Sequence, residues 1–375
     1  MGKSFNILLF NGYFHYRGVG WKGTLDILRA ETTTVEADIS FMDETDLDIV
    51  AALQVAPRVP ANSLGEILGV PTSTITRRLN RLQNDRLMKV IGRFAWPLIL
   101  SANPQQLWVR CLPGQAARVA EQLKAFPEIQ FVMTTSGTCD IYADLFPLHG
   151  SDVNDLLSNR IPSLAGIKSV ESRLMLDSRR VGQSWRLGRL SAAQTEALAA
   201  HIVPVNQPAL RHIEELTDVE FGTMCELGRN ARASAAEVAR TLDVSSSSAY
   251  RAIQMLLATG AISPRVEVEP RAVGYPLTAV ISLQVKPKLI GKVLDRLATH
   301  DSARMVSMVT GKAPVVFHGL FRGPDELAEF ITRDIGALPG IQAMDTCVGV
   351  NVLRRYWMDR ESVFIGEQVE DLLRR

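Results

Sequence analysis

Apolar residues follow helical and strand spacing along the chain, and their pattern recurs when the sequence is shifted by 174 residues. This alignment runs without a gap from about residue 47 to residue 170. The amphipathic stripe that contains Val119 and Leu123, for example, falls on Val293 and Leu297. Helical stripes that match in one gapless register predict a tandem duplication of one structural unit.

Each copy is predicted to begin with three helices and a strand. In the first copy we expect helices over 43–54, 64–68 and 72–84, followed by a strand over 88–95. Asn62 or Ser63 can cap the short second helix, and Gly69 suits its C-terminal end. A short helix, a tight turn and a further helix make up the helix-turn-helix pattern, which the second copy repeats over about 218–260.

The second part of each copy alternates strands and helices in the order βαββαβ. Apolar runs that indicate strands lie at 107–112, 129–134, 140–146 and 167–176 in the first copy, and near 279–285, 304–310, 314–321 and 341–350 in the second. This order is that of the ferredoxin-like split βαβ unit. The predicted fold class is therefore α+β, with two copies of a winged helix-turn-helix, each followed by a ferredoxin-like (ACT-like) βαββαβ domain.

These parts divide the chain into seven predicted segments. They are an N-terminal extension at 1–41, a helix-turn-helix domain at 42–95, a ferredoxin-like effector and dimerisation domain at 104–177, a linker at 178–210, a second helix-turn-helix domain at 211–268, a second ferredoxin-like domain at 278–352 and a tail at 353–375. Residues 1–41 match nothing in the repeat, so we expect poor order there or an over-extended start. The basic, alanine-rich linker is interpreted as a solvated spacer, with a phosphate contact as the alternative.

Composition excludes several classes of protein. The chain has 41 basic and 40 acidic residues, a formal net charge of +1, so any basic site must be local. No stretch approaches the roughly 20 apolar residues of a membrane span, and the run Phe5–Phe10 is too short for a signal peptide. Four cysteines lie far apart without a C-x-x-C pair, which indicates reduced thiols. We therefore expect a cytoplasmic protein with no membrane partner.

Several segments carry a resemblance to a known family. They are Asp46-Leu47-Asp48-Ile49, Arg58, the region Leu68–Leu82, the turn Ser136-Gly137-Thr138-Cys139-Asp140, and Pro162 with Gly166-Ile167. In this order they resemble the Lrp/AsnC (leucine-responsive/asparagine regulator) family of transcription factors, nearly throughout residues 43–355. The resemblance implies a DNA-binding regulator that responds to a small molecule. Because family members pair their βαββαβ sheets, it also implies an intramolecular pseudo-dimer and a homo-oligomer.

The third helix of the first copy is the expected DNA-reading element. Ile75, Leu79 and Leu82 fall on one side of it, and a helix-turn-helix presents the opposite side to the major groove. The residues expected to contact double-stranded DNA there are Thr72, Ser73, Thr74, Thr76, Arg77, Arg78, Asn80 and Arg81. Six basic residues against one acidic residue over 72–93 give a local charge of +5, which favours phosphate contact over a merely solvated face.

The second copy is expected to contact DNA more weakly or not at all. Residues 245–267 carry a net charge of only +1, so most of the electrostatic attraction to phosphate is missing. The candidate contacts are Ser246, Ser247, Tyr250 and Arg251.

A small-molecule site is implied by the resemblance alone. In the family the turn at Ser136 and Gly137 lines a cleft between dimers in which amino acids commonly bind. Ser136, Gly137 and Asp140 are therefore candidate effector contacts, and the Asp140 carboxylate suits an ammonium group. The alternative is a structural hairpin turn with a solvated Asp140. The second copy has Pro314 in place of Asp140, so any ligand there would differ or be absent.

No catalytic pattern stands out in the sequence. Six histidines are scattered without metal-ligand spacing, and neither a G-x-S-x-G motif nor a phosphate-binding loop is present. We expect no enzymatic activity, no cofactor and no metal. Two alternatives stay open: an enzyme like the sirohaem decarboxylases, which are similar to this family, and a small-molecule sensor that does not bind DNA.

Overall fold

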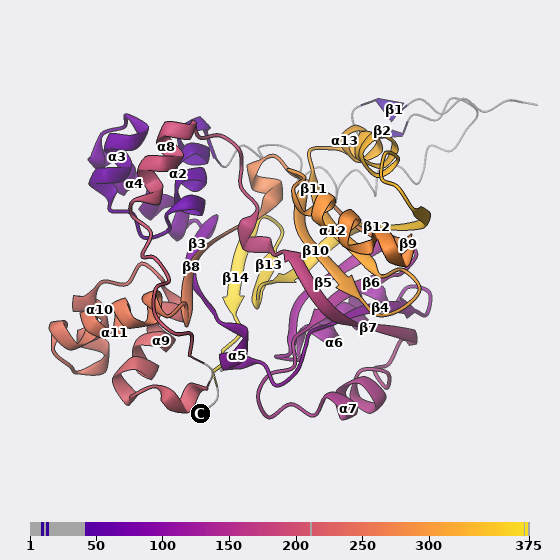
Figure 1. The fold of residues 1–375 in the computed structure, drawn as a ribbon, viewed down its shortest axis with the longest axis horizontal. Helices are drawn as coiled ribbons and strands as arrows, with labels where there is room; N and C mark the ends of the chain where they lie inside the picture. Colours follow the sequence, from indigo (N-terminus) through magenta and orange to yellow (C-terminus); the bar gives the residue numbers. More distant parts are fainter. Residues whose placement is uncertain (1–8, 11–12, 15–41, 211, 371, 374–375) are drawn as a thin grey trace, which may run out of the picture. The chain divides into compact units, whose positions relative to one another are not determined.

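The computed structural model describes residues 9–10, 13–14, 42–210, 212–370 and 372–373 (Figure 1). Met1–Phe41 and Met42–Arg375 are separate compact units. In the first unit, β1 (Leu9–Phe10) and β2 (Tyr13–Phe14) pair antiparallel. The expected poor order of 1–41 otherwise lies outside the described residues. All that follows concerns the second unit.

The second unit begins with three helices and a strand: α2 (Glu44–Val55), α3 (Ala61–Leu68), α4 (Thr72–Asn84) and β3 (Met88–Phe94). Asp43 and Asp46 form a capping box at the start of α2. The predicted cap of α3 was wrong, because this helix begins at Ala61 directly after Pro60 and has no side-chain cap. Asn62 and Ser63 instead lie in its first turn. Gly69 ends α3 in the left-handed conformation, as expected, with φ of 68°.

A second set of helices follows in the other half of the chain: α9 (Asp218–Arg229), α10 (Ala235–Leu242) and α11 (Ser246–Ala258), then β8 (Ile262–Val268). Each helix is capped by a hydroxyl, from Thr217, Ser234 and Ser245 respectively. The elements fall inside the predicted range of 218–260 and the strand after it.

The two helical sets contact each other directly. Strands β3 and β8 pair antiparallel along their whole length, from Met88 opposite Val268 to Phe94 opposite Ile262. Two arginines also cross between the sets: Arg58 donates to the carbonyls of Ala231 and Ala233, and Arg232 donates to those of Pro57 and Val59. Because both exchanges follow the same pattern, each set holds the loop between the first two helices of the other.

Two βαββαβ arrangements make up the rest of the unit. The first contains β4 (Gln105–Cys111), α6 (Ala116–Lys124), β5 (Ile129–Gly137), β6 (Ile141–Leu145), α7 (Val153–Asp155) with a π-helical turn to Arg160, and β7 (Ile167–Arg180). The second contains β9 (Leu277–Val285), α12 (Ile290–Ala298), β10 (Ala303–Val309), β11 (Val315–Phe321), α13 (Pro324–Glu329) with a π-helical turn to Ile335, and β12 (Ile341–Arg355). Short helix α5 (Trp96–Ile99) leads into the first, and β13 (Met358–Glu361) and β14 (Phe364–Gln368) follow the second.

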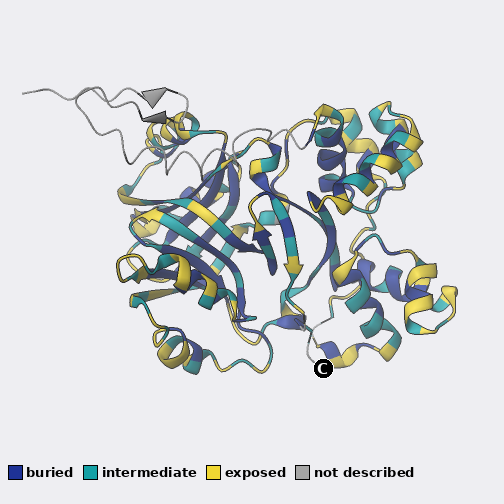
Figure 2. Cartoon of the chain, turned by 180° about the vertical axis from the view of Figure 1, so that it is seen from behind, coloured by how far each residue is buried: buried dark blue, intermediate teal, exposed yellow. Residues whose placement is uncertain are grey.

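These strands form one sheet in the order β14-β13-β12-β5-β6-β4-β7-β10-β11-β9, and β12 also pairs with β9. The eight strands from β12 to β9 therefore close into a ring, in which β5–β12 and β7–β10 join the two halves. Side chains from both halves fill its interior, among them Trp108, Tyr142, Val316 and Cys347. Figure 2 shows dark, buried positions along these strands and on the inner sides of the helices.

The linker is not a solvated spacer, and that prediction was wrong. Its helix α8 (Ala192–Ala199) contacts α2 and α3, with Leu198 fully buried. Arg189 forms ion pairs with Glu44 and Asp48 of α2. Arg189, one of four linker arginines considered for a phosphate contact, thus holds the linker against the first helical set. None of the described helices is long and apolar enough to cross a membrane.

Candidate nucleic-acid interface

Helix α4 presents a polar face to solvent. Ile75, Leu79 and Leu82 are buried against the other helices, as their spacing predicted. On the other side the side chains of Thr72, Ser73, Thr76, Arg77 and Asn80 are exposed, and Thr74 is half-buried. Hydroxyl, amide and guanidinium groups on one exposed helix face can donate hydrogen bonds to phosphates and base edges.

Two arginines of this helix are held by acidic residues of α2. Arg78 Nη1 lies 2.7 Å from the Asp43 carboxylate and 2.9 Å from that of Asp46. Arg81 also pairs with Asp46, whose side chain is only 1% exposed. Because the hydrogen bonds to Asp43 and Asp46 favour its charged form, the pKa of Arg78 is raised. These ion pairs fasten α4 to α2, a role that the sequence interpretation did not assign to Arg78 and Arg81.

Other basic residues between 72 and 93 are also paired or buried within the protein. Arg86 Nη2 lies 2.7 Å from the Glu361 carboxylate, and burial lowers the pKa of both Lys89 and Arg93. The local charge of +5 therefore overstates the free positive charge. Arg77, by contrast, is exposed and forms no ion pair with the residues that the structure describes. It is the arginine of the α4 face best placed to contact DNA.

The corresponding face of α11 is exposed but weakly charged. Ser246, Ser247 and Arg251 are exposed, and the ring of Tyr250 is 57% exposed. Arg251 donates to the Ser248 hydroxyl at 3.3 Å, within its own helix. This face therefore offers hydroxyls, one phenol and one guanidinium.

The predicted effector turn is tied to the second half of the chain. Ser136 and Gly137 end β5 and pair with Val348 and Cys347 of β12. Gly137 has φ of 126°, and a Cβ there would meet the Thr346 carbonyl oxygen at 2.4 Å, so this position requires glycine.

Asp140 is half-buried at the other end of this turn. Its carboxylate accepts a hydrogen bond from the Cys111 backbone N–H at 2.7 Å. This contact gives Asp140 a structural role in the turn, although Asp140 is half-buried and not solvated as the alternative interpretation supposed.

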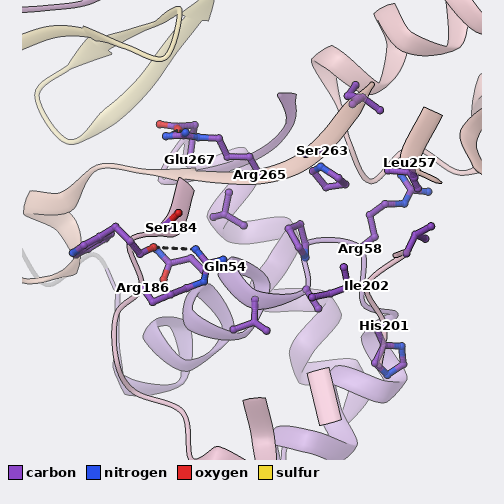
Figure 3. A pocket seen from close by; sticks show the side chains of 18 of the residues that line it. Gln54, Arg58, Ser184, Arg186, His201, Ile202, Leu257, Ser263, Arg265 and Glu267 are labelled. Atoms are coloured by element: carbon purple, nitrogen blue, oxygen red, sulfur yellow. Dashed lines mark hydrogen bonds and ion pairs between the residues drawn. The ribbon is translucent and has the colours of Figure 1, made fainter. Parts of the chain in front are cut away.

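A cavity that the sequence did not reveal lies between the two helical sets. It has a volume of about 480 Å³ and is lined by the α2–α3 loop, two stretches of the linker, α11, β8 and Arg304 of β10. Figure 3 shows Arg58, Arg186 and Arg265 reaching this space from three different segments. No local motif marks the cavity, because its wall is assembled from residues more than 200 positions apart.

Comparison with known proteins points to one family. The sequence model of the AsnC-type helix-turn-helix domain matches residues 42–83, and that of the Lrp/AsnC ligand binding domain matches residues 278–360. The HTH-type transcriptional regulator FL11 of Pyrococcus furiosus is 26% identical over 136 residues, which cover 36% of this chain and 89% of the relative. The regulator LrpA of Pyrococcus abyssi is 25% identical and is covered to 97%, over 36% of this chain. Both domain matches and these relatives support an Lrp/AsnC family regulator.

The match places the exposed face of α4 inside an AsnC-type helix-turn-helix. It places β9–β12 inside an Lrp/AsnC ligand binding domain. The α+β fold class is thereby confirmed. Among solved structures, the siroheme decarboxylase NirDL aligns with a TM-score of 0.53 at 13% identity, covering 83% of this chain and 92% of that protein. At this identity the likeness concerns the fold alone.

Proposed function

We propose that this Lrp/AsnC protein is a sequence-specific, DNA-binding transcriptional regulator. The observation that carries the proposal is the exposed polar face of α4, which lies in the segment that matches the AsnC-type helix-turn-helix model. Arg77 on this face forms no ion pair with the described acidic residues. Relatives named HTH-type transcriptional regulators support it. Thr72, Ser73, Thr74, Thr76, Arg77 and Asn80 are the proposed contacts, whereas Arg78 and Arg81 act chiefly by positioning α4.

The chain is proposed to be a tandem duplication that forms a pseudo-dimer by itself. The reciprocal contacts of Arg58 and Arg232, the pairing of β3 with β8 and the closed ring of strands all support this arrangement. Fusion raises the effective concentration of the pairing far above that of separate chains. The proposed domains are 42–95, 104–177, 211–268 and 278–352, joined by the linker 178–210, and copies of the chain assemble further into a homo-oligomer.

The two helical sets are proposed to contribute unequally to DNA binding. The α11 face has only Arg251 as a cation, so Ser246, Ser247 and Tyr250 give phosphate or backbone contacts of lower affinity. The α4 face reads the sequence.

Control by an amino acid at Ser136, Gly137 and Asp140 is proposed in a modified form. One Asp140 oxygen is engaged by the Cys111 N–H, so an ammonium group would bind the other oxygen. Such an effector would also contact the β5–β12 pairing, because Ser136 and Gly137 belong to it.

The protein is proposed to be cytoplasmic and not an enzyme. The relatives carry regulator names, and the likeness to NirDL concerns the fold alone. Purified protein that removes carboxyl groups from sirohaem would contradict this part of the proposal.

Genome-wide capture of DNA by the purified chain tests the central proposal. Enrichment of a common sequence is expected, followed by salt-dependent binding of that sequence in a gel-shift assay. The variant Arg77→Ala should lose enrichment, while Arg118→Ala, which removes an exposed arginine of α6, should keep it. Absence of any preferred sequence at low salt would refute sequence-specific binding.

A further inference from the structure

The cavity between the helical sets has the size of a small-molecule site. Its volume of about 480 Å³ lies within the range of roughly 300–1,000 Å³ found for ligand pockets. It is remote in sequence from the effector turn at Ser136 and has no residue in common with it.

The buried wall of the cavity carries more positive than negative charge. Among the charged residues that line it, Arg58, Arg186, Arg265 and Arg304 are basic and Glu267 is acidic. Arg265, Arg304 and Glu267 also belong to a buried ionic cluster with Arg355, Arg360 and Glu269, which do not line the cavity; all six are at most 9% exposed. Arg355 lies 2.8 Å from Glu269, Arg360 lies 2.6 Å from Glu267, and Arg265 also pairs with Glu267. Four cations against two anions leave an excess of two positive charges away from bulk solvent.

Arg304 is the member of this cluster without a partner. Its side chain is 8% exposed, lines the cavity and forms no ion pair or hydrogen bond with the described part of the chain. Its guanidinium lies beside Gly182, where an added Cβ would be 3.4 Å from Nε. Burial and the neighbouring Arg355 and Arg265 lower the pKa of Arg304, and they outweigh the opposite effect of the Glu267 and Glu269 carboxylates. A buried guanidinium without an acceptor is costly, and an oxyanion would satisfy it.

The rest of the wall combines apolar residues with polar ones such as Gln54 and Gln254. Pro57, Trp185, Ile202, Val205 and Leu257 face the same space from the α2–α3 loop, the linker and α11. Val205 and Ile202 are substantially exposed there, so a ligand with an apolar body would cover surface that otherwise contacts water.

We propose that this cavity binds a small organic oxyanion, a carboxylate or phosphate ester with an apolar body, whose charged group bonds to Arg304. Both chemistries present oxygen atoms that accept from a guanidinium, and the apolar body packs against Trp185 and Leu257. The proposal does not rest on DNA binding, so it stands or fails separately from the function proposed above.

Titration calorimetry and thermal unfolding of the full chain test the proposal. The probes are phenylacetate, phenyl phosphate, inorganic phosphate and the neutral phenylacetamide. At least one aryl anion should bind with one site per chain and raise the unfolding temperature, and phenylacetamide should bind at least tenfold more weakly. Tighter binding of phenylacetate would indicate a carboxylate site, and tighter binding of phenyl phosphate would indicate a phosphate site. Inorganic phosphate, which lacks the apolar ring, should bind more weakly than phenyl phosphate.

Two variants connect binding to the cavity. Arg304→Met removes the guanidinium and keeps an unbranched apolar stem, so affinity should fall at least tenfold. Arg118→Met, on exposed α6, is the matched control and should bind like wild type. Ser184→Trp fills the cavity from the linker and should also abolish binding, which keeps the test valid if Arg304→Met does not fold. Failure of both aryl anions to bind wild type, equal binding of phenylacetamide, or unchanged affinity in folded Arg304→Met or Ser184→Trp would overturn the proposal.

Discussion

Removal of Arg78 and Arg81 together tests whether these arginines serve the fold or the DNA. In the structure both guanidiniums pair with the Asp46 carboxylate, which is 1% exposed and also accepts the Asp43 backbone N–H. The double variant Arg78→Ala/Arg81→Ala would leave this buried carboxylate without a counter-charge. We therefore expect the first helical set to lose stability.

The size of this loss follows from burial. Breaking a fully buried ion pair by removing one partner costs about 3–5 kcal/mol. The side chains of Arg78 and Arg81 are 19% and 38% exposed, so solvent screens part of the interaction and we expect a loss of about 2–4 kcal/mol. Either single variant should cost less than half of this, because the other arginine still pairs with Asp46.

Urea unfolding followed by circular dichroism measures the loss, and hydrogen exchange of peptides from α2 and α4 locates it. The third substitution Asp46→Asn provides the control, since a neutral amide needs no counter-charge. Adding it to the double variant should recover most of the stability. A double variant that unfolds like wild type yet no longer binds DNA would refute the structural role and return both arginines to the DNA contacts.

Three further predictions follow from other contacts. Arg77→Ala should weaken binding of the preferred DNA by about 1–3 kcal/mol without moving the urea midpoint, and undiminished binding in a gel-shift titration would contradict the assignment of the α4 face. Burial raises the pKa of Asp144 to about 7 in the folded protein, against 3.8 for the free group. Because the unfolded chain loses this proton at lower pH than the folded protein, the free energy of unfolding of wild type should fall by up to about 4 kcal/mol as the pH rises from about 4 to 7. Asp144→Asn can still accept a hydrogen bond from the Tyr142 hydroxyl. Its free energy of unfolding should vary less with pH and exceed that of wild type at pH 8. Urea unfolding measured at several pH values tests this, and the same pH dependence in both proteins would contradict it. Cys139 and Cys347 have their Sγ atoms 3.3 Å apart across the two halves, so diamide should join them in a disulfide that peptide mass spectrometry detects; oxidation that never links this pair would contradict the β5–β12 pairing.

Local patterns predicted the elements well where a helix buries one face. The bounds of α4 agree with the predicted 72–84 because Ile75, Leu79 and Leu82 set both its period and its buried side. The cap of α3 was mispredicted because Pro60 stands at the N-cap position, where it makes no side-chain hydrogen bond. Asn and Ser cap a helix only from the position before its first turn, whereas Asn62 and Ser63 lie within that turn.

Charge was harder to interpret than periodicity, because a sequence shows which residues are charged but not which are paired. Arg78 and Asp43 are 35 positions apart, and Arg86 and Glu361 are 275 apart, so neither pair has a local signature. The same reason explains the linker, whose Arg189 meets Glu44 across 145 positions. Arg77, in contrast, is exposed in the fold, as its place on the helix predicts, and its contact with DNA stays a prediction.

The contacts between the two halves explain how one chain can carry two helical sets with unequal exposed faces. In a homodimer each substitution changes both partners at once, whereas in this chain Arg77 and the α11 face vary independently. The reciprocal bonds of Arg58 and Arg232 and the pairing of β3 with β8 keep the helical sets together irrespective of either face. The α11 face can therefore carry few cations, and a cavity can lie beside Arg304, without a change in the paired scaffold that holds α4. A chain cut within 200–210 tests this argument: the fragments should still associate through β5–β12, β7–β10 and β3–β8 in gel filtration, and fragments that separate at micromolar concentration would contradict it.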